Sequence, residues 1–329
     1  MTSPILSRRA ALAAASAAGA AALLPAMARA ATFTTPDPVT TIVDSHIHLF
    51  DPNRPQGVPY AGPEKSPTHR TGSFPAAYAQ HARPLGIIGA LVVEASPLVE
   101  DNQWVLDQAA GNPIILGMIG NLRPEHADFP ALLARFHGNP LFRGIRYGNL
   151  WDYDLAARSR EPAFLDALKR LAEADLVLET ANQNLALLEG ALRVSDAVPN
   201  LRIVIDHLPA FDPAATDQRA YQAALRNFAA RPQIACKLSE IIHPVAGAIH
   251  TDLAAYSERL GMLRRTFGED RVIFGSDYPQ SDSVAALPQV VGLAKAAFAG
   301  SSTEAREKFF SENSRKFYKW LPRSKAKSK

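Results

Sequence analysis

The sequence predicts a single (β/α)₈ barrel, an α/β fold, on three observations. Short runs rich in β-branched and aromatic residues recur along the chain, and segments with helical spacing separate them. Eight such repeats occupy residues 38–322, close to the roughly 250 residues of a typical barrel of this kind. No glycine-rich phosphate-binding loop follows any of the runs, which removes the usual reason to expect an open nucleotide-binding sheet.

Strands and helices alternate in the order that parallel βαβ units require. The predicted strands are Ile42–Leu49, Ile87–Ala95, Ile114–Ile119, Phe142–Tyr147, Leu176–Thr180, Leu201–Leu208, Gln233–Ser239 and Arg271–Asp277. The predicted helices between them are Val99–Ala110, Phe129–His137, Glu161–Ala174, Leu185–Ala197, Gln218–Ala230 and Thr251–Phe267. A C-terminal helical extension follows, in which Ser301 and Glu304 have the spacing of a capping box. Its aromatic residues are expected to pack against the barrel: Phe309, Phe310, Phe317, Tyr318 and Trp320.

One connection, Phe50–Ile87, is much longer than the others and rich in proline and glycine. Long loops in compact domains are often lids or binding loops. This one leaves the carboxyl end of the first strand, the end at which such barrels carry their active sites.

The first 31 residues have the three parts of a secretory signal peptide. Arg8 and Arg9 precede an alanine-rich apolar stretch, and residues 28–30 (Ala-Arg-Ala) have a small-x-small cleavage pattern. Paired arginines before a weakly hydrophobic stretch are typical of a twin-arginine signal. A membrane anchor, the alternative, needs about 20 strongly apolar residues, and Pro25 argues against it. We expect export to the periplasm by the twin-arginine machinery, followed by cleavage and no membrane association.

The formal charge of +3 comes from the two ends of the chain. Residues 1–31 and 323–329 hold seven of the 35 Lys and Arg and none of the 32 Asp and Glu. The remaining 28 basic and 32 acidic residues leave the body near −4. Because no basic cluster remains there, we expect a small-molecule substrate and no nucleic-acid partner. Residues 323–329 are predicted to be a disordered tail, and Cys236, the single cysteine, a small buried residue.

Ionisable residues gather at the predicted carboxyl ends of the strands. His46 and His48 end the first strand, and residues two apart face the same way, about 6.5–7 Å apart. His207 ends the sixth strand, on the side of the isoleucines two and four residues earlier, and Asp277 ends the eighth. Charged groups beside apolar strands cost free energy unless they have a role. The ends of strands 2, 4, 5 and 7 add Glu94, Arg146, Glu179, Lys237 and Ser239.

These strand ends resemble the amidohydrolase superfamily, in particular its amidohydrolase-2 family. Residues 43–48 (Val-Asp-Ser-His-Ile-His) look like the strand-1 metal motif, and residues 274–279 (Phe-Gly-Ser-Asp-Tyr-Pro) like the strand-8 motif with the catalytic aspartate. Residues 144–146, 205–208 and 236–239 resemble the branch of sugar lactonases and 2-pyrone-4,6-dicarboxylate lactonase. The resemblance extends from about Ile42 to the C-terminal helix. It implies a hydrolase of the lactonase type.

The chain differs from many superfamily members at the ends of strands 4 and 5, and this difference limits the number of metal ions that the resemblance implies. Many superfamily members place a histidine at the end of strand 5 and a carboxylated lysine or a glutamate on strand 4. Here strand 5 ends at Glu179 and strand 4 at Arg146, so we expect no two-metal site. The resemblance leaves at most one divalent ion, Zn or Mn, with the ligands His46, His48, His207 and Asp277. It also permits catalysis without a metal.

The implied reaction opens a lactone of a sugar acid or of an aromatic-degradation product. Asp277 is then the general base that takes a proton from water and returns it to the leaving oxygen. With a metal, the ion polarises the carbonyl and lowers the pKa of water toward about 7; without one, His207 and the other histidines donate hydrogen bonds to the oxyanion. The predicted substrate-binding residues are Glu94, Arg146, Glu179, Lys237, Ser239 and Tyr278.

Alternatives remain open at this stage. Arg146 could instead form a salt bridge with Glu94 or Glu179, and Tyr278 could simply pack. Decarboxylases of the same superfamily resemble the chain in strands 1 and 8, although they usually keep the strand-5 histidine. A non-catalytic periplasmic barrel is a further alternative, and the presence of all four candidate ligands argues against it.

Overall fold

The computed structural model describes residues 41–57 and 67–323. The predicted signal peptide, residues 58–66 of the long connection and residues 324–329 of the predicted tail lie outside the described residues.

Eight parallel strands form one sheet, in which each strand pairs with the next along the chain. They are β1 (Ile42–Ile47), β2 (Ile87–Val93), β3 (Ile115–Gly120), β4 (Phe142–Arg146), β5 (Val177–Glu179), β6 (Arg202–Ile205), β7 (Ile234–Leu238) and β10 (Val272–Phe274). Two backbone hydrogen bonds close this sheet between its first and last strands. The Asp277 N–H donates to the His46 carbonyl (2.8 Å), and the His48 N–H donates to the Tyr278 carbonyl (2.7 Å). The predicted (β/α)₈ barrel is confirmed.

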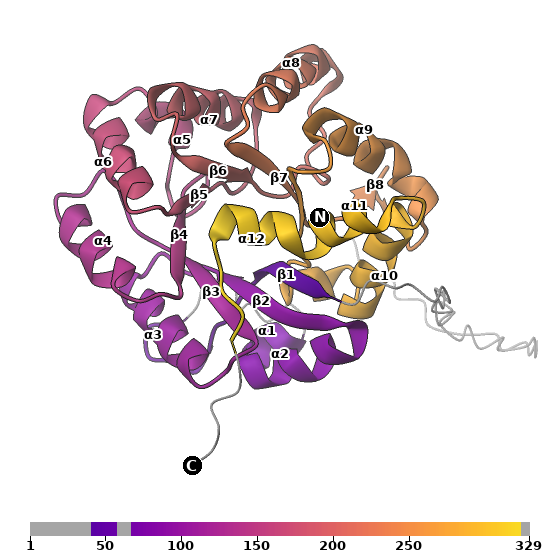
Figure 1. The fold of residues 1–329 in the computed structure, drawn as a ribbon, viewed down its shortest axis with the longest axis horizontal. Coiled ribbons are helices and arrows are strands. Elements are labelled where there is room, and N and C mark those ends of the chain that lie inside the picture. The colour runs from indigo at the N-terminus through magenta and orange to yellow at the C-terminus, as the bar shows by residue number, and fades with distance from the viewer. Residues whose placement is uncertain (1–40, 58–66, 324–329) are drawn as a thin grey trace, which may run out of the picture. The chain divides into compact units, whose positions relative to one another are not determined.

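Helices surround the strands (Figure 1). They include α3 (Val99–Ala110), α4 (Phe129–His137), α6 (Pro162–Glu173), α7 (Leu185–Ala197), α8 (Gln218–Ala229), α9 (Ser257–Phe267) and α10 (Leu287–Phe298). The predicted helices agree with these observed helices to within one residue at each end, with one exception. The α9 helix begins six residues after its predicted start, because a 3₁₀ turn precedes it. Several elements were not predicted, among them α10, the short α5 (Leu155–Arg158) and a hairpin of β8 (Pro244–Val245) and β9 (Ala248–Ile249).

The long connection after β1 is not a single loop. Its described part contains α1 (Pro67–Thr71) and α2 (Pro75–Ala82). Pro75 occupies the first turn of α2, where a proline is tolerated, and Tyr78 of this helix is fully buried. Within the described part of the chain, no helix is long and apolar enough to cross a membrane.

Buried apolar side chains form two layers. The larger layer lies between strands and helices and includes Ile203, Ile205 and Cys236. The smaller layer fills the barrel interior, where Val43, Leu91, Val93, Leu116, Ile119, Val177, Val204, Ala235 and Ile273 meet three C-terminal side chains, Phe317, Tyr318 and Trp320. The interior is therefore a packed core, as expected for this fold.

The C-terminal segment closes the amino-terminal end of the barrel. It comprises α11 (Thr303–Glu307), a π-helical turn (Lys308–Glu312) and α12 (Asn313–Tyr318), which crosses the middle of the barrel in Figure 1. Arg202 at the start of β6 donates from Nε to the Phe317 carbonyl (2.7 Å). The predicted aromatic packing is confirmed, but the helix cap is Ser302 rather than Ser301, since the Ser302 hydroxyl accepts from the Ala305 N–H.

Arg323, the first residue of the predicted tail, makes defined contacts with the barrel. Arg323 is half-buried, and its guanidinium donates to the carbonyls of Ala109 (2.9 Å), Ala110 (3.0 Å) and Ile115 (2.7 Å). The first two are carbonyls at the end of α3, which lack partners within the helix. A cation there also faces the negative end of the helix dipole. Arg323 thus anchors the chain end to the α3–β3 junction.

We predict that Arg323→Ala lowers the free energy of unfolding by about 1–2 kcal/mol, because several charge-assisted hydrogen bonds are lost together. Urea denaturation of the purified protein measures this. Lys316→Ala, an exposed basic residue of α12, is the control and should change stability by less than about 0.5 kcal/mol. Equal effects of the two substitutions would contradict the anchoring role.

Candidate active site

The four side chains predicted as metal ligands meet at the carboxyl ends of the strands. His48 Nε2 lies 3.1 Å and His46 Nε2 lies 3.4 Å from one oxygen, Oδ1 of Asp277. The ring centroids of His46 and His207 are 4.6 Å apart. All four side chains are buried, and even His207 is only 9% exposed. Residues from three distant parts of the sequence thus converge as predicted.

A left-handed backbone turns two of these side chains into the barrel. The φ angle is +53° at His207 and +63° at Asp277, values that are uncommon outside glycine and concentrated at functional sites. At His207 this corrects our reasoning from strand alternation. Ile203 and Ile205 face the helices, so alternation alone would place His207 outside the barrel. The left-handed turn reverses its direction.

Asp44 holds the ends of β1 and β10 together beneath these side chains. Its carboxylate accepts hydrogen bonds from the Ser276 N–H (2.8 Å), the Tyr78 hydroxyl (2.8 Å) and the His46 N–H (3.2 Å). Gly275 allows the close approach of the two strands, because a Cβ there would lie 2.7 Å from the Cβ of His46. Together these contacts fix the direction of the His46 ring.

The ring nitrogens of the two strand-1 histidines suit a cation. His48 Nδ1 lies 3.0 Å from the Val93 carbonyl oxygen and 3.1 Å from that of Glu94. Since carbonyls only accept, Nδ1 carries the proton and Nε2 of the neutral ring carries a lone pair. That lone pair points at Asp277 Oδ1, which is also an acceptor. The two atoms repel each other unless a proton or a cation lies between them. Within the described residues His46 Nε2 is buried without a hydrogen bond. Two imidazoles and a carboxylate therefore fit a divalent ion such as zinc.

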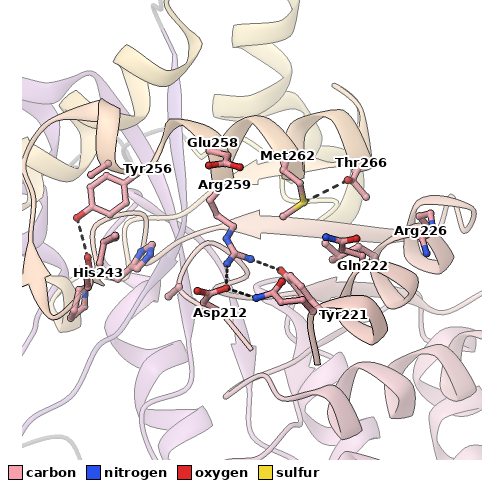
Figure 2. A pocket seen from close by; sticks show the side chains of 17 residues that line it. Asp212, Tyr221, Gln222, Arg226, His243, Tyr256, Glu258, Arg259, Met262 and Thr266 are labelled. Atoms are coloured by element: carbon pink, nitrogen blue, oxygen red, sulfur yellow. Dashed lines mark hydrogen bonds and ion pairs between the residues drawn. The ribbon is translucent and has the colours of Figure 1, made fainter. Parts of the chain in front are cut away.

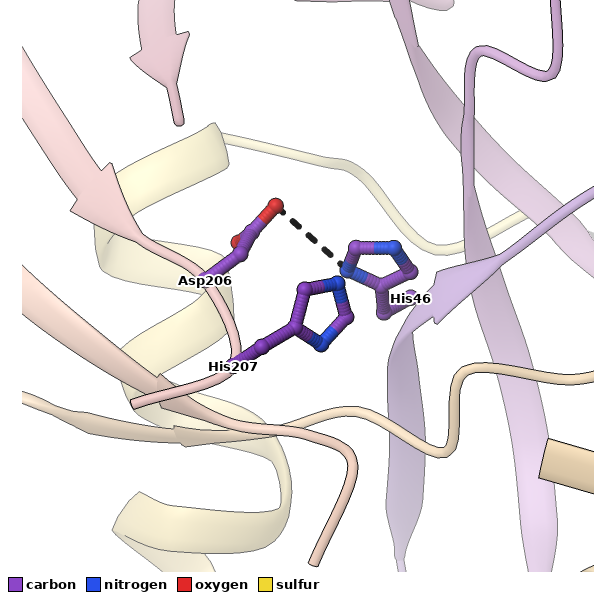
Figure 3. A group of neighbouring side chains, drawn as sticks. All are labelled: His46, Asp206 and His207. Carbon is purple, nitrogen blue, oxygen red and sulfur yellow. Dashed lines mark ion pairs between the residues drawn. The ribbon is translucent and has the colours of Figure 1, made fainter. Parts of the chain in front are cut away.

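Two further groups of donor atoms overlap this one. Figure 3 shows the first, in which the Asp206 carboxylate points to His46, with His207 beside them. The second joins His207 and Asp277 to Glu240. Because the groups share members, they form one connected set of donors. Glu240 was missed by the sequence analysis, although it follows directly after the strand-7 end and has a left-handed φ of +48°.

The buried environment shifts the titration of these groups. Burial raises the pKa of Asp277 to about 8; the charge of Arg146 opposes this shift, and the charge of Asp44 adds to it. Burial, followed by the charge of Arg146, lowers the pKa of His48 to about 3. The pKa values of the other two imidazoles are also well below their usual value, first because of burial and then because of nearby cations. The histidines are therefore neutral at pH 7, the form that binds metals.

Below the histidines lies a layer of buried charges. Lys237 Nζ is 2.6 Å from Glu179 Oε1, 3.2 Å from Asp206 Oδ1 and 3.3 Å from His46 Nδ1. Lys237, Glu179 and Asp206 are 0% exposed. This corrects the predicted substrate-binding roles of Lys237 and Glu179: both side chains are paired inside the barrel, underneath the ring of His46.

Arg146 and Glu94 do lie beside the histidines, as a pair. Arg146 Nε donates to Glu94 Oε1 (2.7 Å), which is the salt bridge considered as an alternative. Trp151 Nε1 donates to the other oxygen, Oε2, at 2.9 Å. Trp151 was missed by the sequence analysis, since nothing in the spacing of the loop after β4 marks it.

The remaining two predicted substrate ligands make internal contacts. Ser239 is fully buried, and its hydroxyl lies 2.9 Å from His207 Nδ1. Tyr278 packs its ring against Tyr78 (5.3 Å between centroids) on the helix side of β10. In the structure Ser239 therefore orients a histidine, and Tyr278 packs, the alternative considered above.

A cavity of about 590 Å³ lies elsewhere, between α8 and α9 (Figure 2). Its lining contains none of the predicted site residues. Arg259 bonds there to Asp212 and to the Tyr221 hydroxyl, and Tyr256 donates to the His243 carbonyl. Because these polar groups are already paired with one another, we place the chemistry at the strand ends.

Comparison with known proteins gives consistent matches. The family model described as Amidohydrolase matches residues 43–320. An L-fucono-1,5-lactonase of Burkholderia ambifaria is 32% identical over 201 residues, which cover 60% of this chain and 66% of the relative, just under two thirds. An L-fucono-1,5-lactonase of Burkholderia multivorans is 27% identical over 65% of this chain and 73% of the relative.

Solved structures share the fold. A Burkholderia multivorans amidohydrolase crystallised with bound zinc superposes with a TM-score of 0.74 at 21% identity, over 85% of this chain and all of that one. A protein of Pseudomonas putida assigned as a 2-pyrone-4,6-dicarboxylic acid hydrolase gives a TM-score of 0.67 at 22% identity, over 85% and 98%.

We predict that zinc affinity rises about tenfold per pH unit between pH 6 and 8 and then levels off. Below its pKa of about 8, Asp277 holds a proton that the ion must displace, whereas the histidines are already neutral. Competition with a chromophoric chelator measures the affinity. Asp277→Asn is the control, because it removes the titrating group and should flatten the slope. An affinity of the unsubstituted protein that does not change over this range would contradict the prediction.

Proposed function

The chain belongs to the amidohydrolase family, and from this premise we propose that it is a lactonase-type hydrolase that opens the cyclic ester of a sugar acid. The observation that carries the proposal is the convergence of His46, His48 and Asp277, with two neutral imidazoles facing one carboxylate oxygen. The names of the two Burkholderia relatives, both L-fucono-1,5-lactonases, support the same reaction class.

We propose that His46, His48 and Asp277 hold one divalent ion. Zinc is favoured over manganese because two of the three donors are imidazole nitrogens and one is a carboxylate oxygen. When bound, the ion would polarise the lactone carbonyl and favour the carboxylate form of Asp277 over its protonated form. The alternative without metal fits less well. The His48 Nδ1 proton is directed to the carbonyls of Val93 and Glu94, so the neutral ring has none at Nε2 to donate to an oxyanion.

The proposed reaction needs one proton-transfer group and one hydrogen-bond donor from the chain. Asp277 takes a proton from the attacking water as oxygen bonds to the carbonyl carbon. It returns that proton to the ring oxygen when the ester C–O bond breaks, which yields the hydroxy acid. The Ser239 hydroxyl oxygen accepts a hydrogen bond from the backbone N–H of His207. The proton of the same hydroxyl can then be donated to Nδ1 of the His207 ring. His207 then carries its proton on Nε2 and can donate it to the developing oxyanion.

Charge at the site favours a neutral sugar lactone over a dicarboxylate. Binding two substrate carboxylates calls for cations that are not already neutralised. Arg146 is paired with Glu94 at 2.7 Å, and Lys237 is buried between Glu179 and Asp206. The Glu94–Arg146 pair and Trp151 offer acceptors and donors to hydroxyl groups instead. The proposed substrate class is therefore a polyhydroxylated lactone without a free carboxylate.

The proposed place of action is the periplasm, reached through the twin-arginine route. The support is the sequence pattern of residues 1–31 alone. We predict that the double substitution Arg8→Lys and Arg9→Lys keeps the protein in the cytoplasm, because the arginine pair is the recognised feature of such signals. Cell fractionation with immunoblotting measures this, with Arg29→Lys as the control. Periplasmic protein at unchanged levels in the double variant would count against this route.

The proposed reaction is tested on a panel of aldonolactones and 2-pyrone-4,6-dicarboxylate, with acid release followed by a pH indicator. Hydrolysis of an aldonolactone in preference to the pyrone is expected. Asp277→Asn should lower kcat/KM by about 10²–10⁴-fold, the usual contribution of general acid–base catalysis, without loss of fold by circular dichroism. Asp212→Asn, in the cavity between α8 and α9, should retain activity within a few-fold. Full activity of Asp277→Asn, or release of carbon dioxide instead of lactone opening, would contradict the proposal.

A further inference from the structure

The C-terminal helix reaches the buried charges beneath the site through one hydroxyl group. The Tyr318 hydroxyl donates to Glu179 Oε1, across 139 residues of sequence. The same oxygen accepts from Lys237 Nζ at 2.6 Å. Tyr318 is 1% exposed, and its ring lies under the ammonium, with Nζ 5.4 Å from the ring centroid.

Lys237 in turn touches a candidate metal ligand. Its ammonium is 2.6 Å from Glu179 Oε1 and 3.2 Å from Asp206 Oδ1, and it lies 3.3 Å from His46 Nδ1. The other Asp206 oxygen, Oδ2, lies 3.6 Å from the same nitrogen of His46 and is the acceptor that faces its N–H when Nε2 of the ring ligates an ion. The lysine stem also passes Gly275, where an added Cβ would lie 3.2 Å from Lys237 Cδ. The position of this ammonium is therefore set by two carboxylates, and one of them, Asp206, faces His46 Nδ1.

Tyr318 itself is firmly held. Arg202 donates to the Phe317 carbonyl at 2.7 Å, and Asn313 Nδ2 donates to the Val272 carbonyl at 2.8 Å. Both contacts tie α12 to the beginnings of strands, β6 and β10. The hydroxyl of Tyr318 is thus a fixed point on the barrel floor, whereas the Glu179 carboxylate can rotate about its terminal bond unless something holds it.

We propose that Tyr318 is a positioning residue for the active site, which acts through Glu179 and Lys237 to fix the ring of His46. Without its hydroxyl, Glu179 Oε1 loses one of two donors, and the carboxylate can turn toward Asp206. Lys237 then follows Glu179, and Asp206, the carboxylate that faces His46 Nδ1, loses the cation that holds it in place. Groups that orient a metal-ligating histidine from behind commonly contribute 10- to 100-fold to metal affinity or activity.

The alternative is that Tyr318 only fills the barrel floor. Tyr318→Phe separates the two, since it keeps the ring, its packing and its contact with Lys237, and removes only the hydroxyl. Tyr221→Phe is the matched control. Tyr221 is equally buried, and its hydroxyl bonds Arg259 on the outer side of the barrel.

Three measurements on the full-length protein test the proposal: zinc affinity by chelator competition, the ¹⁵N shifts of the His46 ring, and kcat and KM on an aldonolactone. For Tyr318→Phe we expect zinc affinity and kcat each to fall about tenfold, KM to stay within twofold, and the His46 shifts to move. Tyr221→Phe should change none of these. Glu179→Gln combined with Tyr318→Phe should lose less than the sum of the two single losses, because the residues act in one chain of contacts.

Only the kinetic measurement rests on the proposed lactone hydrolysis. If the protein opens no lactone but the zinc affinity and the His46 shifts respond as expected, the proposed function fails and the positioning role stands. The positioning role is overturned if Tyr318→Phe leaves the zinc affinity and the His46 shifts unchanged, or if Tyr221→Phe alters them to the same extent.

Discussion

The seam between the first and last strands of the barrel is the contact on which the site depends. The two backbone hydrogen bonds that close the sheet come from Asp277 and His48 and go to His46 and Tyr278. The residues that complete the barrel are thus the residues that carry the candidate chemistry or stand next to it. Closing the ring brings one carboxylate oxygen within 3.4 Å of two imidazole nitrogens. Any change that opened the seam would separate the metal ligands at the same time.

The side chains in the barrel interior form layers along its axis, and each layer holds the side chains of the next in position. Aromatic side chains of the C-terminal segment and the inward-facing apolar residues form a dry floor. Lys237, Glu179 and Asp206 lie above it without exposure to solvent. A buried charge group of this kind is costly to assemble, and removal of one partner leaves the others uncompensated. We therefore interpret it as a support for the histidine layer, since it forms no contact with solvent and Lys237 lies against His46.

The sequence predicted the fold closely, because periodicity and strand-end composition are local signals. Five of the six predicted helices lie within a residue of their observed bounds at each end, and His46, His48, His207 and Asp277 lie together as expected. Their convergence could be predicted because carboxyl ends of parallel strands share one face. What could not be predicted depends on backbone twists and side-chain direction. The inward turn of His207 needs a left-handed φ. The ring that lies under the buried ammonium of Lys237 belongs to Tyr318, a residue 81 positions later that approaches from the opposite end of the barrel.

Two acceptor atoms that face each other at the seam, one from His48 and one from Asp277, also link the site to the stability of the fold. His48 Nε2 and Asp277 Oδ1 are 3.1 Å apart. Burial raises the pKa of Asp277 to about 8, although the charges of Arg146 and Lys237 oppose this rise. At neutral pH a proton on Asp277 removes the repulsion between these two acceptor atoms. A divalent ion would remove it more fully, because it would also bind Nε2 of His46. Since a ligand that binds only the folded state stabilises that state, occupation of this site would strengthen the closure of the barrel itself. An enzyme built in this way gains from acquiring its ion where it folds. That agrees with the proposed twin-arginine route, because this route carries proteins that have already folded.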